Sequence, residues 1–207
     1  DHWIRAAVQV GFWNIVLTTN LAIPVLSYKE AFNHTPEYAG KKEGWLWEYS
    51  VTNNSGTYTC KLYGKFNDNK QTEWRMLISK EGAYTDVEWY TGTSNNDKSG
   101  GSWSLNKNAY NATNYLDVDW AKSGSKKDIK YTAVEAGTDG YGSYIEYGVD
   151  TAEVLDAHYN IHLTKDYHDV NIMWSRSTKE GKSVEPKHYL DNDPRCWGTD
   201  LKNTVCN

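Results

Sequence analysis

The sequence AAVQVGFWNIVLTTNLAIPVLSY, residues 6–28, has no charged side chain, although 24% of the whole chain is Asp, Glu, Lys or Arg. On a helical wheel its large hydrophobic residues surround the axis instead of gathering on one side. They are Val8, Val10, Phe12, Trp13, Ile15, Val16, Leu17, Leu21, Ile23 and Leu26. This pattern predicts a helix that is buried on every face, in or against a sheet formed by the rest of the chain. Pro24 is expected to kink this helix, because it removes the hydrogen bond to Asn20.

A membrane-spanning helix is the alternative interpretation of this stretch, because about 20 mostly apolar residues suffice to cross a bilayer. Several polar side chains argue against it, since unpaired polar groups are costly in hydrocarbon but find partners inside a protein. They are Gln9, Asn14, Thr18, Thr19 and Asn20. A helix buried in a protein core is therefore preferred. The start Asp1-His2-Trp3 has no Met and is not a basic leader, which predicts a chain that is already processed.

Length and charge narrow the class of protein. At 207 residues the chain is long enough for a sizeable core, and we expect one domain over residues 1–207. The formal net charge is −5 and the pI is about 5.7, so no basic surface is expected to bind nucleic acid. Ten Trp and sixteen Tyr against three Phe are typical of strands, interfaces and sugar-stacking surfaces.

The three cysteines divide into a pair and a single residue. Cys196 and Cys206 lie ten positions apart, and a disulfide between them would stabilise the fold by roughly 2–3 kcal/mol. Cys60 lies between Tyr58 and Leu62 in an alternating segment and is expected to be a small buried hydrophobe. Two cysteines that can form a disulfide, with one left free, favour an oxidising compartment over a compartment in which all three thiols are reduced.

Alternating hydrophobic residues from position 45 onward predict an antiparallel meander. A turn at Asn54-Ser55 pairs residues 45–52 with the next strand and places Tyr49 opposite Cys60. A slip of one residue would turn one hydrophobic face outward, so this register is well specified. The following hairpin places Trp74 over Gly64, where the indole covers exposed backbone.

Further hairpins extend the meander to about ten strands. A turn at Glu81-Gly82 would bring Trp74 opposite Trp89 and Met76 opposite Val87. Later alternating segments cover residues 103–105, 115–121, 141–148, 157–164 and 168–175. The predicted organisation is a helical segment and connector over 1–40, the meander over 45–177 and an irregular tail over 178–207. Because closure removes both sheet edges, we expect a barrel or strongly curled sheet, with a two-layer sandwich as the alternative.

Two groups of side chains have the residue types that a reaction or a metal requires. His158 and His162 share a strand face, and a turn at Lys165-Asp166 sets His162 opposite Asp169, which favours metal binding or acid–base chemistry. Asp117 and Asp119 project to one side of a strand, as paired carboxylates do in glycoside hydrolases. Both groups are expected on the solvated outer face, so a structural role is preferred for each.

Glu146 is the third candidate, because its strand has two competing faces. Ser143, Ile145 and Tyr147 alternate with Tyr144 and Glu146. We expect Ile145 to face the core, which leaves Glu146 in solvent, whereas a buried Glu146 with a cation would be a functional candidate. No phosphate-binding loop, nucleophile elbow or HExxH motif is present, so no cofactor is expected.

Four motifs carry a resemblance to a family. Residues 31–34 (AFNH), 45–50 (WLWEYS), 75–92 (RMLISKEGAYTDVEWYTG) and 101–105 (GSWSL) resemble those of uncharacterised exported or lipid-anchored proteins of gut-dwelling bacteria. The resemblance covers most of the chain. It implies a lipocalin-like antiparallel barrel, export through a leader removed before Asp1, a lipid-bearing cysteine upstream, and no catalytic residue.

The sequence thus predicts an exported, non-catalytic β protein that binds or scaffolds at the cell surface, with a glycan or a protein as partner and membrane contact only through the lipid anchor. An alternative is a carrier that holds a small apolar or aromatic ligand in the barrel, which requires a void of about 300 Å³ or more beside the helix. A hydrolase acting on glycans through Asp117 with Asp119, or through Glu146, is less favoured.

Overall fold

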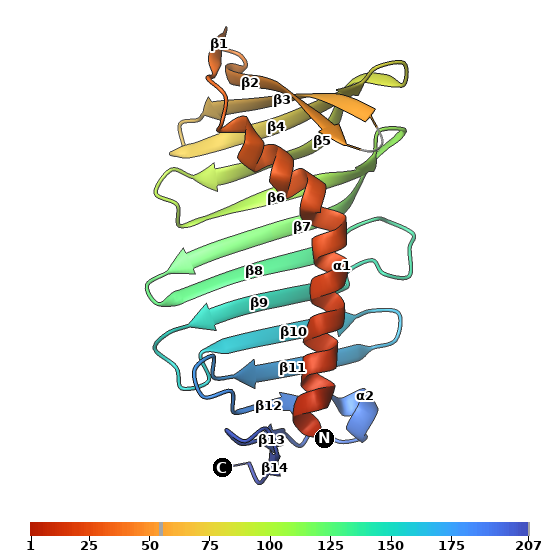
Figure 1. The fold of residues 1–207 in the computed structure, drawn as a ribbon, viewed down its shortest axis with the longest axis vertical. Helices are drawn as coiled ribbons and strands as arrows, with labels where there is room; N and C mark the ends of the chain where they lie inside the picture. Colours follow the sequence, from red (N-terminus) through yellow and green to blue (C-terminus); the bar gives the residue numbers. More distant parts are fainter. Residues whose placement is uncertain (54–55, 207) are drawn as a thin grey trace. The chain divides into compact units, whose positions relative to one another are not determined.

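The computed structural model describes residues 1–53 and 56–206, and antiparallel strands dominate it (Figure 1). Within these residues one sheet contains fourteen strands that follow each other in chain order. They are β1 Glu37–Gly40, β2 Gly44–Asn53, β3 Gly56–Phe66, β4 Gln71–Lys80, β5 Tyr84–Asn95, β6 Gly100–Asn108, β7 Asn111–Ser123, β8 Lys126–Ala133, β9 Tyr144–Asp150, β10 Ala157–Leu163, β11 His168–Trp174, β12 Gly181–Val184, β13 Arg195–Trp197 and β14 Asn203–Thr204.

The sheet is not closed, because β1 and β14 end it and do not pair with each other. The predicted barrel of about ten strands is therefore not observed. The two edge strands have only four and two residues. Very short edge strands limit unwanted pairing at an open edge, which is the problem that barrel closure would otherwise solve.

The described part of the chain also forms two helices, α1 His2–Ala31 and the single turn α2 Pro186–Tyr189. α1 is longer than predicted at both ends and continues through Pro24. The Ser27 hydroxyl donates a hydrogen bond to the Pro24 carbonyl at 2.8 Å. Among the described residues, no helix is long and apolar enough to cross a membrane.

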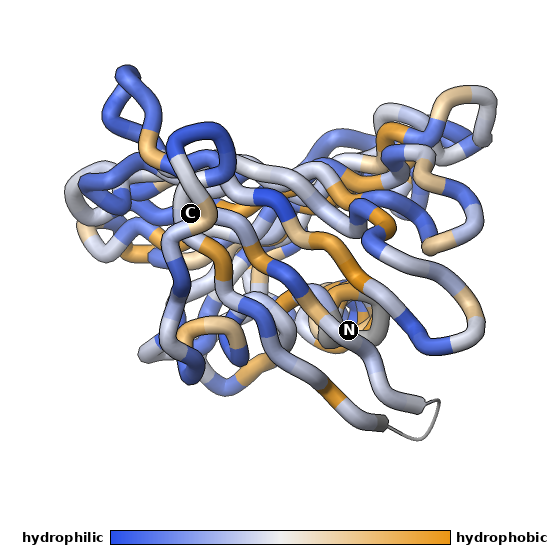
Figure 2. Tube along the Cα trace, turned by 90° about the horizontal axis from the view of Figure 1, so that it is seen from above, coloured by the Kyte–Doolittle hydropathy of each residue, from blue (hydrophilic) through white to orange (hydrophobic). Residues whose placement is uncertain are grey.

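The prediction that α1 is buried on every face is wrong. Ala6 and Ala31 are buried, whereas Phe12 is 55% exposed and Ile15 is 69% exposed. In Figure 2 the coil that begins at the N-terminus carries hydrophobic (orange) positions. The exposure of its side chains shows that only part of its circumference is covered. An open sheet offers a helix one face, so the remaining sides of the helix stay in solvent. The side chains of Ile23 and Leu26 lie outside the described set.

The chain divides into two compact units, whose boundaries fall inside α1 and inside β7. Asp1–Thr18 with Val118–Asn207 form one unit, and Thr19–Asp117 form the other. In the first unit Ala6 of α1 packs on a hydrophobic cluster from the strands. Its buried members are Ile145, Tyr159, Ile161, Val170, Ile172 and Trp197.

In the second unit the end of α1 packs on aromatic side chains of the meander. The Tyr28 ring meets Trp74 and Trp103 edge-on, with centroids 5.5 and 5.0 Å apart. The Tyr49 hydroxyl donates a hydrogen bond to the Ser27 carbonyl. Burial of these rings raises the pKa of Tyr28 to about 12. Aromatic side chains of the strands thus form the contact with the helix.

The predicted registers of the first two hairpins are confirmed. Tyr49 lies opposite Cys60 in the β2–β3 pair, and Trp74 lies opposite Gly64 in the β3–β4 pair. A Cβ on Gly64 would stand 2.7 Å from Trp74 Cζ3, so the ring does cover bare backbone. The turn predicted at Asn54-Ser55 lies outside the described residues.

The predicted β4–β5 register is wrong because the pairing is irregular. Met76 lies opposite Tyr90, and Leu77 opposite Glu88, which leaves Trp89 as an extra residue in β5. A second irregularity follows between Ile78 and Lys80. Such β-bulges insert residues into one strand only, and simple alternation counted from a turn does not reveal them.

The C-terminal tail is not irregular as predicted, since it adds β12, α2, β13 and β14 to the fold. These strands have two to four residues, too few for an alternating pattern to be recognised in the sequence. The disulfide between Cys196 and Cys206 is formed as predicted, and it joins β13 to the residues after β14. Cys60 is free and buried, as expected.

Candidate ligand-binding site

A hollow of about 330 Å³ lies between the first turns of α1 and the strands of the same unit. Its lining combines α1 with β11, β13 and the loop before β12, and consists of Trp3, Ala6, Ala7, Val10, Gly11, Ile172, Trp174, Lys179 and Trp197. Three of these nine residues are tryptophans. The site is therefore an apolar hollow with several flat aromatic walls.

Small residues of the helix leave room on one side of this hollow, and a glycine positions Trp197 on the other side. Outside the neighbouring backbone of the helix, no heavy atom lies within 4 Å of the position that a Cβ on Gly11 would occupy. On the sheet, Gly181 lies opposite both Trp174 and Trp197. A Cβ on Gly181 would stand 2.5 Å from the Trp197 ring, so only glycine lets that indole lie against the strand.

The chemistry of the lining suits binding without a reaction. Trp197 Nε1 donates a hydrogen bond to the Lys179 carbonyl at 2.7 Å, which fixes the indole. The Lys179 ammonium donates to the Arg176 carbonyl. Among the described lining residues there is no carboxylate, histidine, thiol or hydroxyl to act as nucleophile, acid or base.

A larger hollow of about 490 Å³ lies in the other unit, on the face formed by the outward side chains of β3 to β6. Two of its charged groups pair with each other, Arg75 and Glu43, and the Arg75 guanidinium lies 4.9 Å from the Tyr63 ring centroid. Asn67 also donates to Glu73 at 3.1 Å. Because Arg75 covers the Tyr63 ring, this hollow offers a ligand less aromatic surface than the tryptophan-lined hollow does.

The predicted site residues lie apart from both hollows. Ile145 is in the core, as expected, which places Glu146 on the opposite face of β9. Glu146 is half-buried and accepts a hydrogen bond from Asn160 at 3.1 Å. Asp117 Oδ1 accepts from Ser104 at 2.7 Å, a structural contact. Asp119 is exposed.

The predicted histidine group is divided. His162 Nδ1 lies 2.6 Å from Asp169 Oδ1, as the register indicated. The His162 ring stacks on Tyr144, with centroids 5.2 Å apart. His158 does not join this pair, and its ion-pair partner is Asp128 on β8 at 3.6 Å.

Sequence reasoning missed a buried carboxylate, Glu185, which is 1% exposed. Arg5 and His168 both bind it, and Gln9 Nε2 lies 3.4 Å from it. Burial alone would raise the pKa of Glu185, but the hydrogen bonds from Arg5 and His168 outweigh burial and hold the pKa below its ordinary value. No periodic signal marks this residue, because it lies in a short connection before Pro186.

The tryptophans of the hollow were also not predicted as a group, since Trp3, Trp174 and Trp197 come from three distant segments. Only Trp174, as the end of an alternating strand, carried a sequence signal. Comparison of the chain with protein-family models, curated proteins and solved structures finds no match.

Proposed function

We propose that this chain is a non-catalytic, exported binding protein that holds a small aromatic ligand in the hollow between α1 and β11. The observation that carries the proposal is a hollow of about 330 Å³ with three tryptophans in its lining. Ligand sites begin at about 300 Å³ and are lined mainly by apolar and aromatic side chains. The ligand lies beside the helix, not in the lumen of a barrel, because the sheet is open.

The lining favours a planar aromatic ligand. Indole rings offer flat apolar surfaces, and aromatic pairs gain about 0.5–1.5 kcal/mol beyond the burial of their area. Lys179 supplies the one formal charge among the described lining residues, so an acidic group on the ligand would be accommodated better than a basic one. The small volume restricts the ligand to about two fused rings with short substituents.

Export is part of the proposal and is supported by the disulfide between Cys196 and Cys206. Disulfides persist in oxidising compartments and are rare in the cytosol. We infer that the protein acts outside the cytoplasm, at the cell surface.

Calorimetric titration tests the proposal, with naphthalene-1-sulfonate and indole-3-acetate as probes. Both are aromatic anions of two fused rings with one short acidic substituent, and we expect each to bind saturably to one site. In Gly11→Leu the added side chain has room to enter the hollow, so the affinity should fall at least tenfold. Asn14→Leu adds the same side chain at an exposed position of α1 and is the matched control.

Three results would contradict the proposal. They are the absence of saturable binding by both probes, equal affinity in Gly11→Leu and the wild type, and equal losses in Gly11→Leu and Asn14→Leu. Both substitutions replace a residue with a stronger helix former, so unfolding is not expected to confuse the comparison.

A further inference from the structure

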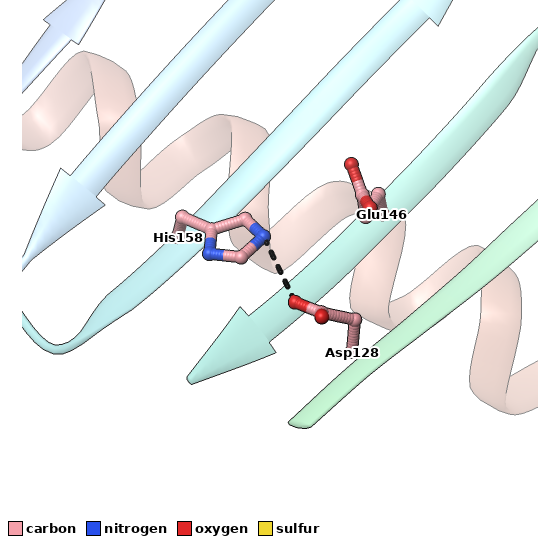
Figure 3. A group of neighbouring side chains, drawn as sticks. All are labelled: Asp128, Glu146 and His158. Atoms are coloured by element: carbon pink, nitrogen blue, oxygen red, sulfur yellow. Dashed lines mark ion pairs between the residues drawn. The ribbon is translucent and has the colours of Figure 1, made fainter. Parts of the chain in front are cut away.

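Three strands bring a histidine and two carboxylates together on the face of the sheet that points away from α1 (Figure 3). Asp128 of β8 lies opposite Gly148 of β9, and Gly148 lies opposite His158 of β10. Glu146 precedes Gly148 by two positions and shares its face. The three side chains therefore meet above β9.

Gly148 makes the convergence possible. A Cβ on this residue would stand 2.2 Å from Asp128 Oδ1 and 2.2 Å from His158 Cε1. The aspartate and the imidazole thus lean toward each other across a strand that has no side chain between them. One oxygen of each carboxylate and one nitrogen of His158 all lie within 4.8 Å of one another.

One carboxylate oxygen of the half-buried Asp128 is available to a further ligand. Its Oδ1 is buried without a hydrogen-bond partner, and His158 Nε2, at 3.6 Å, is beyond hydrogen-bond distance. Leaving such an oxygen unsatisfied destabilises the fold. Its Oδ2 lies 3.4 Å from Lys126, whose side chain is 56% exposed and free to turn into solvent.

We propose that Asp128, Glu146 and His158 bind one divalent transition-metal ion of the zinc type. Zinc bonds of about 2.0–2.2 Å to N and O place neighbouring ligand atoms of a tetrahedral site about 3.3–3.6 Å apart. The distance of 3.6 Å between Asp128 Oδ1 and His158 Nε2 already lies in this range, so only the Glu146 carboxylate must move closer. Asn160, which donates to Glu146 at 3.1 Å, orients that ligand from outside the site.

The ligand set selects the class of ion. Imidazole suits zinc and its first-row neighbours, whereas magnesium and calcium prefer oxygen ligands alone. Two carboxylates also balance the double positive charge. Three protein ligands leave the fourth position to water on the solvent side, as in open zinc sites. The site is on the opposite face from the tryptophan-lined hollow and does not depend on the proposed ligand.

Calorimetric titration with Zn²⁺ tests this inference. We expect one equivalent to bind the wild type and to raise its melting temperature, because a ligand that binds only the folded state stabilises it. Asp128→Asn, Glu146→Gln and His158→Gln should each weaken binding at least tenfold. His162→Gln removes the neighbouring histidine of the same strand face, which pairs with Asp169, and should leave zinc binding unchanged.

A measurement without metal separates a metal site from a structural ion pair. Asp128→Asn should then leave the melting temperature unchanged or raise it, since it replaces a carboxylate that has a buried oxygen without a hydrogen-bond partner by a neutral amide. A loss of stability of equal size with and without zinc would overturn the inference. So would a wild type that binds no zinc, binding that survives His158→Gln, or equal losses in His162→Gln and His158→Gln.

Discussion

The guanidinium of Arg5 in α1 makes two hydrogen bonds with the carboxylate of Glu185, 180 positions later: Nε donates to Oε2 at 2.8 Å and Nη2 donates to Oε1. His168 Nε2 lies 2.9 Å from the same carboxylate. This network ties the first turns of α1 to the C-terminal strands of its unit. It also positions the helix wall of the tryptophan-lined hollow, because Ala6 and Ala7 follow Arg5 directly.

Removal of Arg5 should cost more than neutralisation of Glu185. Arg5→Met leaves a buried carboxylate with fewer donors, and we expect the free energy of unfolding to fall by about 3 kcal/mol. Glu185→Gln leaves Arg5, whose side chain is 34% exposed and can be hydrated, so about 1–2 kcal/mol should be lost. Urea denaturation of both variants measures the difference. An equal or reversed order would show that the carboxylate is not held by Arg5.

The same pair predicts how stability depends on pH. The pKa of Glu185 is lower in the folded chain than its ordinary value of 4.5, because the hydrogen bonds from Arg5 and His168 outweigh burial. A carboxylate with a lowered pKa stabilises the folded chain fully above pH 4.5, its ordinary pKa. This stabilisation is lost as the pH falls through the pKa that the group has in the folded chain. The free energy of unfolding should therefore decrease below about pH 5, and this decrease should be smaller in Glu185→Gln. Identical acid profiles for both proteins would refute this assignment.

Reduction of the disulfide should destabilise the C-terminal strands. Cys196 and Cys206 close a loop with a sequence separation of 10, for which the loss on reduction is about 2–3 kcal/mol. We expect a reductant to lower the melting temperature of the wild type but not that of the Cys196→Ser/Cys206→Ser variant. A similar shift in the double variant would point instead to an effect of the reductant that does not involve this bond.

Addition of one methyl group at Gly64 should disturb the aromatic contact in the second unit. The Cβ of Gly64→Ala would stand 2.7 Å from Trp74 and 3.2 Å from Trp47, and overpacking of this kind costs about 1–3 kcal/mol. Gly140→Ala is the matched control, because no heavy atom lies within 4 Å of its Cβ position. Chemical denaturation compares the two. Equal stability of the two variants would mean that the rings move aside without cost.

Much of the strand pairing was predictable from the sequence because it is local. The β2–β3, β3–β4 and β10–β11 registers follow from alternation and from the position of one turn, and all three are confirmed. The inward side of β9 was predicted from Ile145, and the disulfide from the spacing of Cys196 and Cys206. Each of these features depends on residues close together in the chain.

Features that join distant segments were decided only by the tertiary structure. The alternating pattern of the strands is the same in an open and a closed sheet, so the sequence did not show that the sheet stays open. For this reason the hydrophobic pattern of residues 6–28 did not reveal how much of α1 the sheet would cover. The convergence of Asp128 and His158 needs two strand registers and a glycine between them. The Arg5–Glu185 pair joins the two ends of the chain. Local sequence fixes which side of a strand a residue occupies, whereas packing among strands and helix determines which residues meet there.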